Sequence, residues 1–329
     1  MATLTNIVQT YSQKGQAEDF QEAIYNVTPW ETPVMSAIGR SKAKAKIHRW
    51  QTDELKGATT NAQLEGDEIG TGDLTAITAN TEVFNFTQIT RKVIGVTGTM
   101  DAVDKYGRAS EVAYQVAKGM KELKVDIEFA ICRNQAGTAG ATGTARTSGG
   151  MEAWIQSNQF ATTNATTTGG FTTTGSINAS ADTTTTVMVY TETALKNVIT
   201  TIWNAAGGSP DMIALSGKNK ALMSNTTNFP GVATRFRDVN AGAQAQIISG
   251  VDLFVSDFGT HKIVPSRQVR DRTVLVLNTD YWSTAFLRPF QTIELAKTGD
   301  HERRMLLAEW TLVSKNERAS GKLPNLATT

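Results

Sequence analysis

The clearest pattern in the sequence is a long amphipathic stretch between Ser110 and Arg133. Its large apolar residues recur at intervals of three and four, which places them on one face of an α-helix: Val112, Val116, Met120, Leu123, Ile127 and Ile131. Ser110 is a favourable N-cap residue, and the carboxylate of Glu111 suits the positive end of the helix dipole. We therefore predict one helix of about 36 Å with a single buried face.

Residues 40–99 alternate between strand-like and polar composition. Within residues 40–50, a period of two places one set of side chains on the same face of a predicted strand: Arg40, Lys42, Lys44, Lys46 and His48. Residues 83–99 again have the composition of a strand, whereas residues 51–82 are rich in Gly, Thr and Ala. Because this polar segment is too long for a simple turn, we predict an extended hairpin or flap.

Residues 137–186 change character sharply and are rich in Gly and Thr. A flexible linker is one interpretation of this composition. We favour the other, a surface insertion of short strands and turns, because threonine suits strands and the segment contains apolar anchors. These anchors are Met151, Trp154, Ile155, Phe160 and Phe171.

From Val187 onward the pattern alternates between helix and strand. A helix is predicted over Thr191–Ala206, because Gly207, Gly208 and Pro210 end its apolar period. A short strand over Met212–Leu215 and a helical turn over Asn219–Met223 follow. Further strands are predicted over Val251–Val255, Lys262–Val264, Thr273–Leu277, Ser283–Leu287, Thr292–Ala296 and Arg304–Ser314. The polar tail, Asn316–Thr329, is expected to lie over a surface or a neighbour. Taken together, these elements predict an α+β fold class.

Composition narrows the function classes. Lys plus Arg number 32 and Asp plus Glu number 31, so the net charge of +1 gives no support to a dedicated nucleic-acid binder. Cys132 is the only cysteine, which excludes an intramolecular disulfide and favours synthesis in a reducing compartment. The chain has neither a signal-peptide pattern at its start nor a run of about 18 apolar residues. We therefore expect a soluble protein made in a cytoplasm, with no membrane partner.

Sequence patterns of enzymes are missing. The histidines, His48, His261 and His301, lack partners at metal-ligand spacing, and we interpret them as surface or interface residues. Cys132, near the end of the predicted helix, is expected to be a buried packing residue rather than a nucleophile. Lys218 and Lys322 each follow a glycine as in a phosphate-binding loop, but neither is followed by Ser or Thr. We therefore predict no catalytic residue, no metal site and no cofactor.

The order of these parts resembles the major capsid proteins of tailed bacteriophages, the Hong Kong 97 fold family. The segment Thr28–Gly39, with sequence TPWETPVMSAIG, looks like the start of one large subgroup of these proteins. The closing segment, from LNTDYW at Leu277–Trp282 to Thr311 and Leu312, is similar to the return strands of that subgroup. The resemblance extends over most of the chain.

The resemblance implies a division of the chain into an arm, a loop and two domains. The implied parts are an N-terminal arm (1–40), an extended-loop region (41–99), a peripheral domain with a spine helix (100–136 and 271–329), the Thr/Gly-rich insertion (137–186) and an axial domain (187–270). It also implies self-assembly into pentamers and hexamers that form an icosahedral head shell around double-stranded DNA. The expected further partners are a separate scaffolding protein, a portal and, in some relatives, decoration proteins. Some relatives carry a Lys–Asn crosslink, but Lys56 has no matching partner here and no crosslink is predicted.

Other functions stay open at this stage. An encapsulin shell shares the implied fold but encloses protein cargo, and the threonine-rich region is compatible with an enzyme or a surface-binding module. For the shell, oppositely charged segments are the candidate inter-subunit contacts. We call them the basic segment (Arg40, Lys42, Lys44 and Lys46) and the acidic cluster (Glu65, Asp67, Glu68 and Asp73). They either meet between subunits or are merely solvated, since exposed ion pairs contribute only about 0–1 kcal/mol each; a third option directs the lysines toward packaged DNA.

Overall fold

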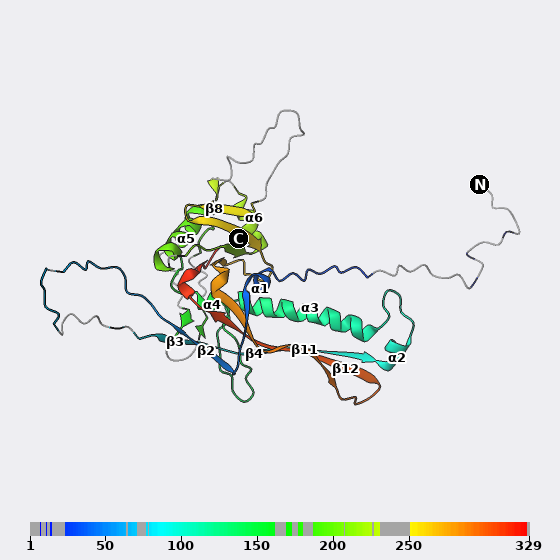
Figure 1. The fold of residues 1–329 in the computed structure, drawn as a ribbon. Coiled ribbons are helices and arrows are strands. Elements are labelled where there is room, and N and C mark those ends of the chain that lie inside the picture. Colours follow the sequence, from blue (N-terminus) through cyan, green and yellow to red (C-terminus); the bar gives the residue numbers. More distant parts are fainter. Residues whose placement is uncertain are drawn as a thin grey trace.

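The computed structural model describes residues 24–63, 65–70, 79–161, 169–172, 177–179, 187–206, 208–225, 227–230 and 251–327, with residues 7, 11, 14 and 77. Two larger sheets and one long helix organise this part of the chain (Figure 1). The helices are α1 (Pro33–Ala37), α2 (Gly98–Ala102), α3 (Glu111–Cys132), α4 (Met151–Trp154), α5 (Glu192–Ala206) and α6 (Gly217–Met223), with short 3-10 turns η2 (Thr279–Tyr281) and η3 (Glu317–Ala319).

The first sheet is built on a long antiparallel hairpin. Among the described residues its strand order is β1 (Gly39–Lys42), β11 (Trp282–Leu295), β12 (His301–Ser314) and β4 (Gln88–Thr97), with β1 parallel to β11. The prediction of two short strands over residues 283–296 was wrong, because β11 is continuous. Its register shifts between Phe286 and Arg288 and again before Gln291, which accommodates Pro289, a residue without an N–H to donate.

Helix α3 packs along this sheet and confirms the predicted long helix. The hydroxyl oxygen of Ser110 accepts the backbone N–H of Ala113, so the predicted cap is present. Leu123, Ile127 and Ile131 have no exposed surface. These residues show that the apolar period identified the buried face correctly.

The predicted single strand over residues 40–50 was wrong. The chain forms β1, leaves the first sheet at residues 43–46, and forms β2 (Ile47–Thr52) in a separate ribbon with β3 (Thr81–Phe86). Ala43 is 1% exposed and packs with Ala285 and Val313, whereas residues 44–46 are exposed. Burial of this small alanine at the bend breaks the alternation, so the basic residues do not share one strand face.

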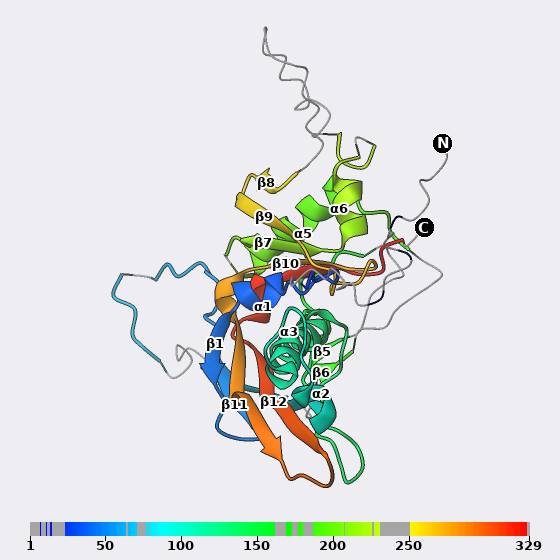
Figure 2. The same cartoon turned by 90° about the vertical axis from the view of Figure 1, so that its right-hand side faces the viewer.

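The second sheet separates two apolar cores. Its order among the described residues is β13 (Gly321–Leu323), β10 (Val274–Leu277), β7 (Met212–Leu215), β9 (Gly259–Pro265) and β8 (Leu253–Ser256). Met212 and Ala214 face the core shared with α3, whereas Ile213 and Leu215 face the core beneath α5 and α6. Figure 2 shows this sheet above α3, with the β11–β12 hairpin extending below.

Two segments from the C-terminal part of the chain complete the second sheet. β10 pairs with β7, and β13 pairs with β10, so this sheet continues past residue 270. The expectation of a polar tail lying over a surface was therefore wrong for residues 316–327. Lys322 and Leu323 have no exposed surface, and Leu326 is 1% exposed.

The described part of the Thr/Gly-rich region forms short, anchored elements. Isolated bridges join Thr138 to Thr147 and Ala141 to Thr144, and α4 follows. A minimal ribbon, β5 (Gly170–Phe171) with β6 (Ile177–Asn178), places the ring of Phe171 in a stack on Trp154, with centroids 5.9 Å apart. These contacts favour the interpretation as an insertion over that of a flexible linker.

Candidate assembly surfaces

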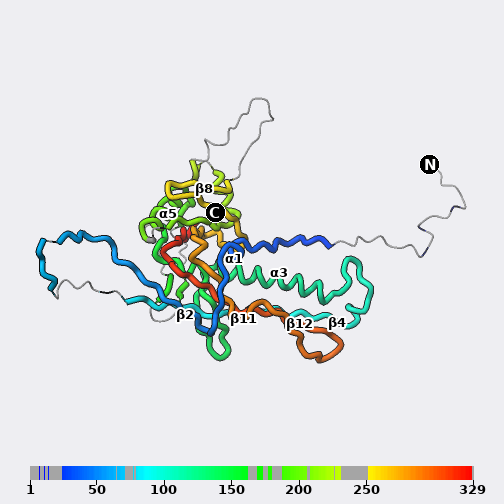
Figure 3. The backbone as a smooth tube through the Cα atoms, viewed as in Figure 1, coloured from blue at the N-terminus to red at the C-terminus, as the bar shows by residue number. Residues whose placement is uncertain are grey.

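The predicted flap is a long loop that leaves the body of the molecule. We call residues 53–80, between β2 and β3, the extended loop. In Figures 1 and 3 its described part runs away from both sheets, and Glu54 at its start is tied back to Arg318 by an ion pair of 2.9 Å. Three large apolar side chains of this loop are almost completely exposed: Leu55 (99%), Ile69 (90%) and Ile77 (96%).

On the other side of the body, the chain before α1 runs alongside α3 (Figure 1). The ammonium nitrogen of Lys121 lies 4.5 Å from the ring centroid of Trp30, a cation–π contact. At the start of α1, the backbone N–H groups of Val34 and Met35 donate to the Glu128 carboxylate over 3.3 and 3.0 Å. Ser266 donates to the same carboxylate over 3.0 Å. This buried carboxylate, whose pKa is raised by burial, fastens residues 33–37 to α3.

The residues of the basic segment lie in two places. Arg40 and Lys42 lie on β1, and Lys44 and Lys46 lie in the connection that follows, all of them exposed. The backbone carbonyl of Lys46 accepts the N–H of Thr87 over 2.9 Å. The connection therefore runs from β1 at one edge of the first sheet to Thr87, beside β4 at the other edge.

The acidic cluster lies on the extended loop. Glu65, Asp67 and Glu68 are exposed, and Asp73 lies outside the described residues. Within one subunit, the described residues of this cluster form no ion pair with the basic segment. The two sets are thus both available in the subunit, and their pairing between subunits stays a prediction.

Sequence reasoning missed a groove beside β4. A hairpin over residues 137–149 stands next to the first sheet, and the groove between them is lined by Ile89, Ala139, Gly140, Ala141, Thr144, Ala145 and Arg146. Gly140 and Gly143 have φ values of +68° and +88°, which glycine tolerates without strain. Arg146 and Arg288 both bind the buried carboxylate of Glu309, over 2.7 and 2.8 Å. The glycine spacing was the one sequence signal for this turn.

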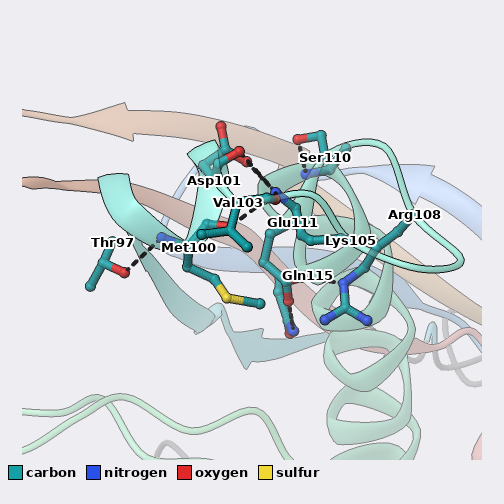
Figure 4. A network of polar contacts seen from close by, with 10 residues as sticks. Thr97, Met100, Asp101, Val103, Lys105, Arg108, Ser110, Glu111 and Gln115 are labelled. Atoms are coloured by element: carbon teal, nitrogen blue, oxygen red, sulfur yellow. Dashed lines mark hydrogen bonds and ion pairs between the residues drawn. The ribbon is translucent and has the colours of Figure 1, made fainter. Parts of the chain in front are cut away.

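The far end of the first sheet is held by a network of polar contacts, shown in Figure 4. The ammonium group of Lys105 donates to the carbonyls of Met100, Asp101 and Val103 over 2.8–3.0 Å, which satisfies the end of α2. A hydrogen bond from Gln115 and the ion pair with Arg108 lower the pKa of Glu111 at the start of α3. This turn exposes Val103 and Tyr106, so it is a further candidate contact surface.

The described ranges also bear on metal binding and membrane insertion. No group of three or more His, Cys, Asp or Glu side chains there is placed to hold a metal ion. Likewise, none of the described helices is both long and apolar enough to cross a bilayer. The predicted helix residue Cys132 is fully buried, and burial raises the pKa of its thiol.

A long helix on a long-stranded sheet, a second sheet between two cores, an arm and an extended loop together define the Hong Kong 97-like capsid fold. The capsid protein of cyanophage A-1(L) is 14% identical, with 98% of this chain and 99% of that one covered and a TM-score of 0.65. The SrpI encapsulin from Synechococcus elongatus PCC 7942 is 10% identical, with 96% and 94% covered and a TM-score of 0.54. At such identities these likenesses show the fold alone.

Sequence relatives add the family. The major capsid protein of Escherichia phage Phieco32 is 27% identical over 351 aligned positions, covering 95% of each chain. The profile of the SU10 major capsid protein family matches residues 4–327. The chain belongs to this family and is a major capsid protein of a tailed phage, which forms the shell of the virion from many copies of itself.

Proposed function

We propose that the chain assembles as pentamers and hexamers into an icosahedral head shell that encloses double-stranded DNA. The observation that carries this proposal is the extended loop. The three large apolar side chains among its described residues are 90–99% exposed in the subunit, although exposure of apolar surface to water is unfavourable. A neighbouring subunit would cover them, and obligate interfaces commonly bury roughly 2,000 Å² or more.

In this proposal the protein acts through its interfaces and catalyses no reaction. The extended loop lies across one neighbour and the arm crosses another. The peripheral (100–136, 271–329) and axial (187–270) domains, which share the second sheet through β10 and β13, make further contacts. The acidic cluster meets the basic segment of a neighbour. Assembly takes place in the host cytoplasm with a scaffolding protein and a portal, and packaged DNA is contacted without sequence preference.

Electron microscopy of the expressed chain, alone and with a candidate scaffolding protein, tests this proposal. We expect closed icosahedral shells with pentamers at the vertices. A product that stays monomeric under both conditions would overturn it. The contents of particles isolated from infected cells separate the alternatives, because DNA supports the head shell and an enclosed protein cargo supports an encapsulin.

A further inference from the structure

The groove beside β4 has an apolar centre that the subunit leaves open. Ile89 lines the groove and is 46% exposed. Val93, four residues further along the same face of β4, is 53% exposed. Across the groove the hairpin contributes small side chains, Ala139, Ala141 and Ala145. The surface is therefore a shallow, partly apolar hollow that an apolar side chain can enter.

Positive charge surrounds this hollow. Arg91 lies between Ile89 and Val93 on β4, is exposed, and forms no ion pair with any described residue. On the other side, Arg146 and Arg288 share the single carboxylate of Glu309, which leaves one positive charge in excess. A complementary partner would present an apolar side chain flanked by carboxylates.

Lys46 belongs to the same rim. Its carbonyl accepts the N–H of Thr87, and the Arg146 guanidinium donates to the carbonyl of Thr87 over 3.2 Å. The side chain of Lys46 is exposed. Part of the basic segment thus lies beside the groove.

The extended loop carries the matching pattern. Ile69 is 90% exposed and directly follows Asp67 and Glu68 in the sequence. Glu65 lies four residues before Ile69. Leu55 fits less well, because its neighbours are Glu54, which already pairs with Arg318 of the same subunit, and the cationic Lys56. Of the exposed apolar side chains with described neighbours in this loop, Ile69 is the one flanked by uncompensated acids.

We infer that Ile69 of one subunit inserts into the groove formed by β4 and the 137–149 hairpin of a second copy, while Asp67 and Glu68 contact its basic rim. This inference rests on the proposed function, since it specifies where the extended loop docks. The two sites do not cover each other within one subunit, because both remain exposed. Residues 53–69 span up to about 55 Å when extended, so the loop can reach a neighbour.

Disulfide trapping in assembled shells tests the contact. We would combine Ile69→Cys with Ile89→Cys, and use Leu55→Cys with Ile89→Cys as the matched control. The native Cys132 has no exposed surface, so it contributes little background. After oxidation we expect a ladder of linked subunits on a non-reducing gel, at least tenfold stronger than for the control pair. Shells in which the two pairs link equally, or the Ile69 pair does not link, would overturn the inference.

A second measurement does not depend on the engineered cysteines. Ile69→Asp should lower the yield of shells at least tenfold, whereas Ile69→Val and Thr60→Asp, at an exposed polar position of the same loop, should leave it within about twofold. Since all these side chains are exposed in the subunit, circular dichroism of the unassembled chains should be unchanged. Normal shell yield from Ile69→Asp would contradict the inference while leaving the proposed function intact. Failure of the unmodified chain to form any shell would overturn both.

Discussion

Arg270 and Glu152 form a two-pronged ion pair beside the second sheet. The Nε atom of Arg270 lies 2.9 Å from one carboxylate oxygen, its Nη2 atom contacts the other, and Thr273 donates to the latter over 2.7 Å. Glu152, on α4, is 1% exposed. The backbone carbonyl of Glu152 also accepts a hydrogen bond from the ammonium group of Lys322 over 2.7 Å. The inserted region, the second sheet and the C-terminal segment therefore depend on one another.

Loss of the Arg270 side chain should destabilise the subunit strongly. In Arg270→Met the carboxylate of Glu152 stays buried without its cation, which typically costs about 3–5 kcal/mol. Denaturant unfolding of the unassembled subunit, followed by tryptophan fluorescence, measures the change. The double variant with Glu152→Gln should recover part of the loss, and Arg91→Met, at an exposed position, should change stability by less than about 0.5 kcal/mol. A neutral Arg270→Met would contradict the assigned role.

The Glu128 carboxyl should make stability depend on pH. Its pKa is raised by burial, although hydrogen bonds from Met35, Val34 and Ser266 oppose the shift. Between the unfolded value and the raised folded value, the folded state binds more protons, so the contribution of Glu128 is full below the unfolded pKa and is lost as pH rises. The stability of the natural chain relative to Glu128→Gln should therefore fall across this window, by at most about 1.4 kcal/mol per pH unit. Unfolding titrations of both chains from pH 4 to 8 check this; a constant or rising difference would contradict it.

Helices with a strong apolar period were predictable, because the spacing of apolar residues indicates which face of the helix is buried. Leu123, Ile127 and Ile131 are fully buried as expected, and Leu195 and Val198 likewise on α5. The extended loop was also predictable, since no apolar period runs through residues 51–82. In each case a local pattern determines the local structure.

Features that depend on distant contacts were not predictable. The burial of Ala43 is caused by Ala285 and Val313, more than 200 positions away, and nothing in residues 40–50 indicates it. Lys322 looks like a solvated tail residue until its ammonium group reaches the carbonyl of Glu152. The groove required the hairpin, β4 and Glu309 together. The candidate contacts named from charge alone stay predictions.

Close backbone approach gives another test of the fold. A Cβ atom on Gly150 would contact the carbonyl oxygen of Arg133 and lie 2.8 Å from that of Ala130, both at the C-terminal end of α3. Gly150→Ala should therefore destabilise the subunit by about 3 kcal/mol, because backbone atoms must move. Gly217→Ala is the matched control, with no atom within 4 Å of the new Cβ, and it should be neutral or stabilising by up to about 1 kcal/mol. Thermal unfolding compares them, and equal melting temperatures would contradict the packing at Gly150.

The charge complementarity between subunits can be tested by exchange. Changing the three lysines of the basic segment to Glu should impair shell formation, because like charges would then face the acidic cluster of the neighbour. The affected side chains are exposed, so the variant subunit should fold normally. Reversing the acidic cluster to lysine in the same chain should restore shells if the two sets pair.

Salt separates this pairing from a general effect of net charge. Contacts between exposed charges weaken as the Debye length falls from about 10 Å at 0.1 M salt to about 3 Å at 1 M. The difference in shell yield between the natural chain and the lysine variant should therefore shrink at high salt, as electron microscopy and sedimentation would show. Normal shells from the lysine variant alone at 0.1 M salt would exclude the pairing. Impaired shells without rescue by the reversed acidic cluster would instead favour a different anionic partner for the basic segment, such as the packaged DNA.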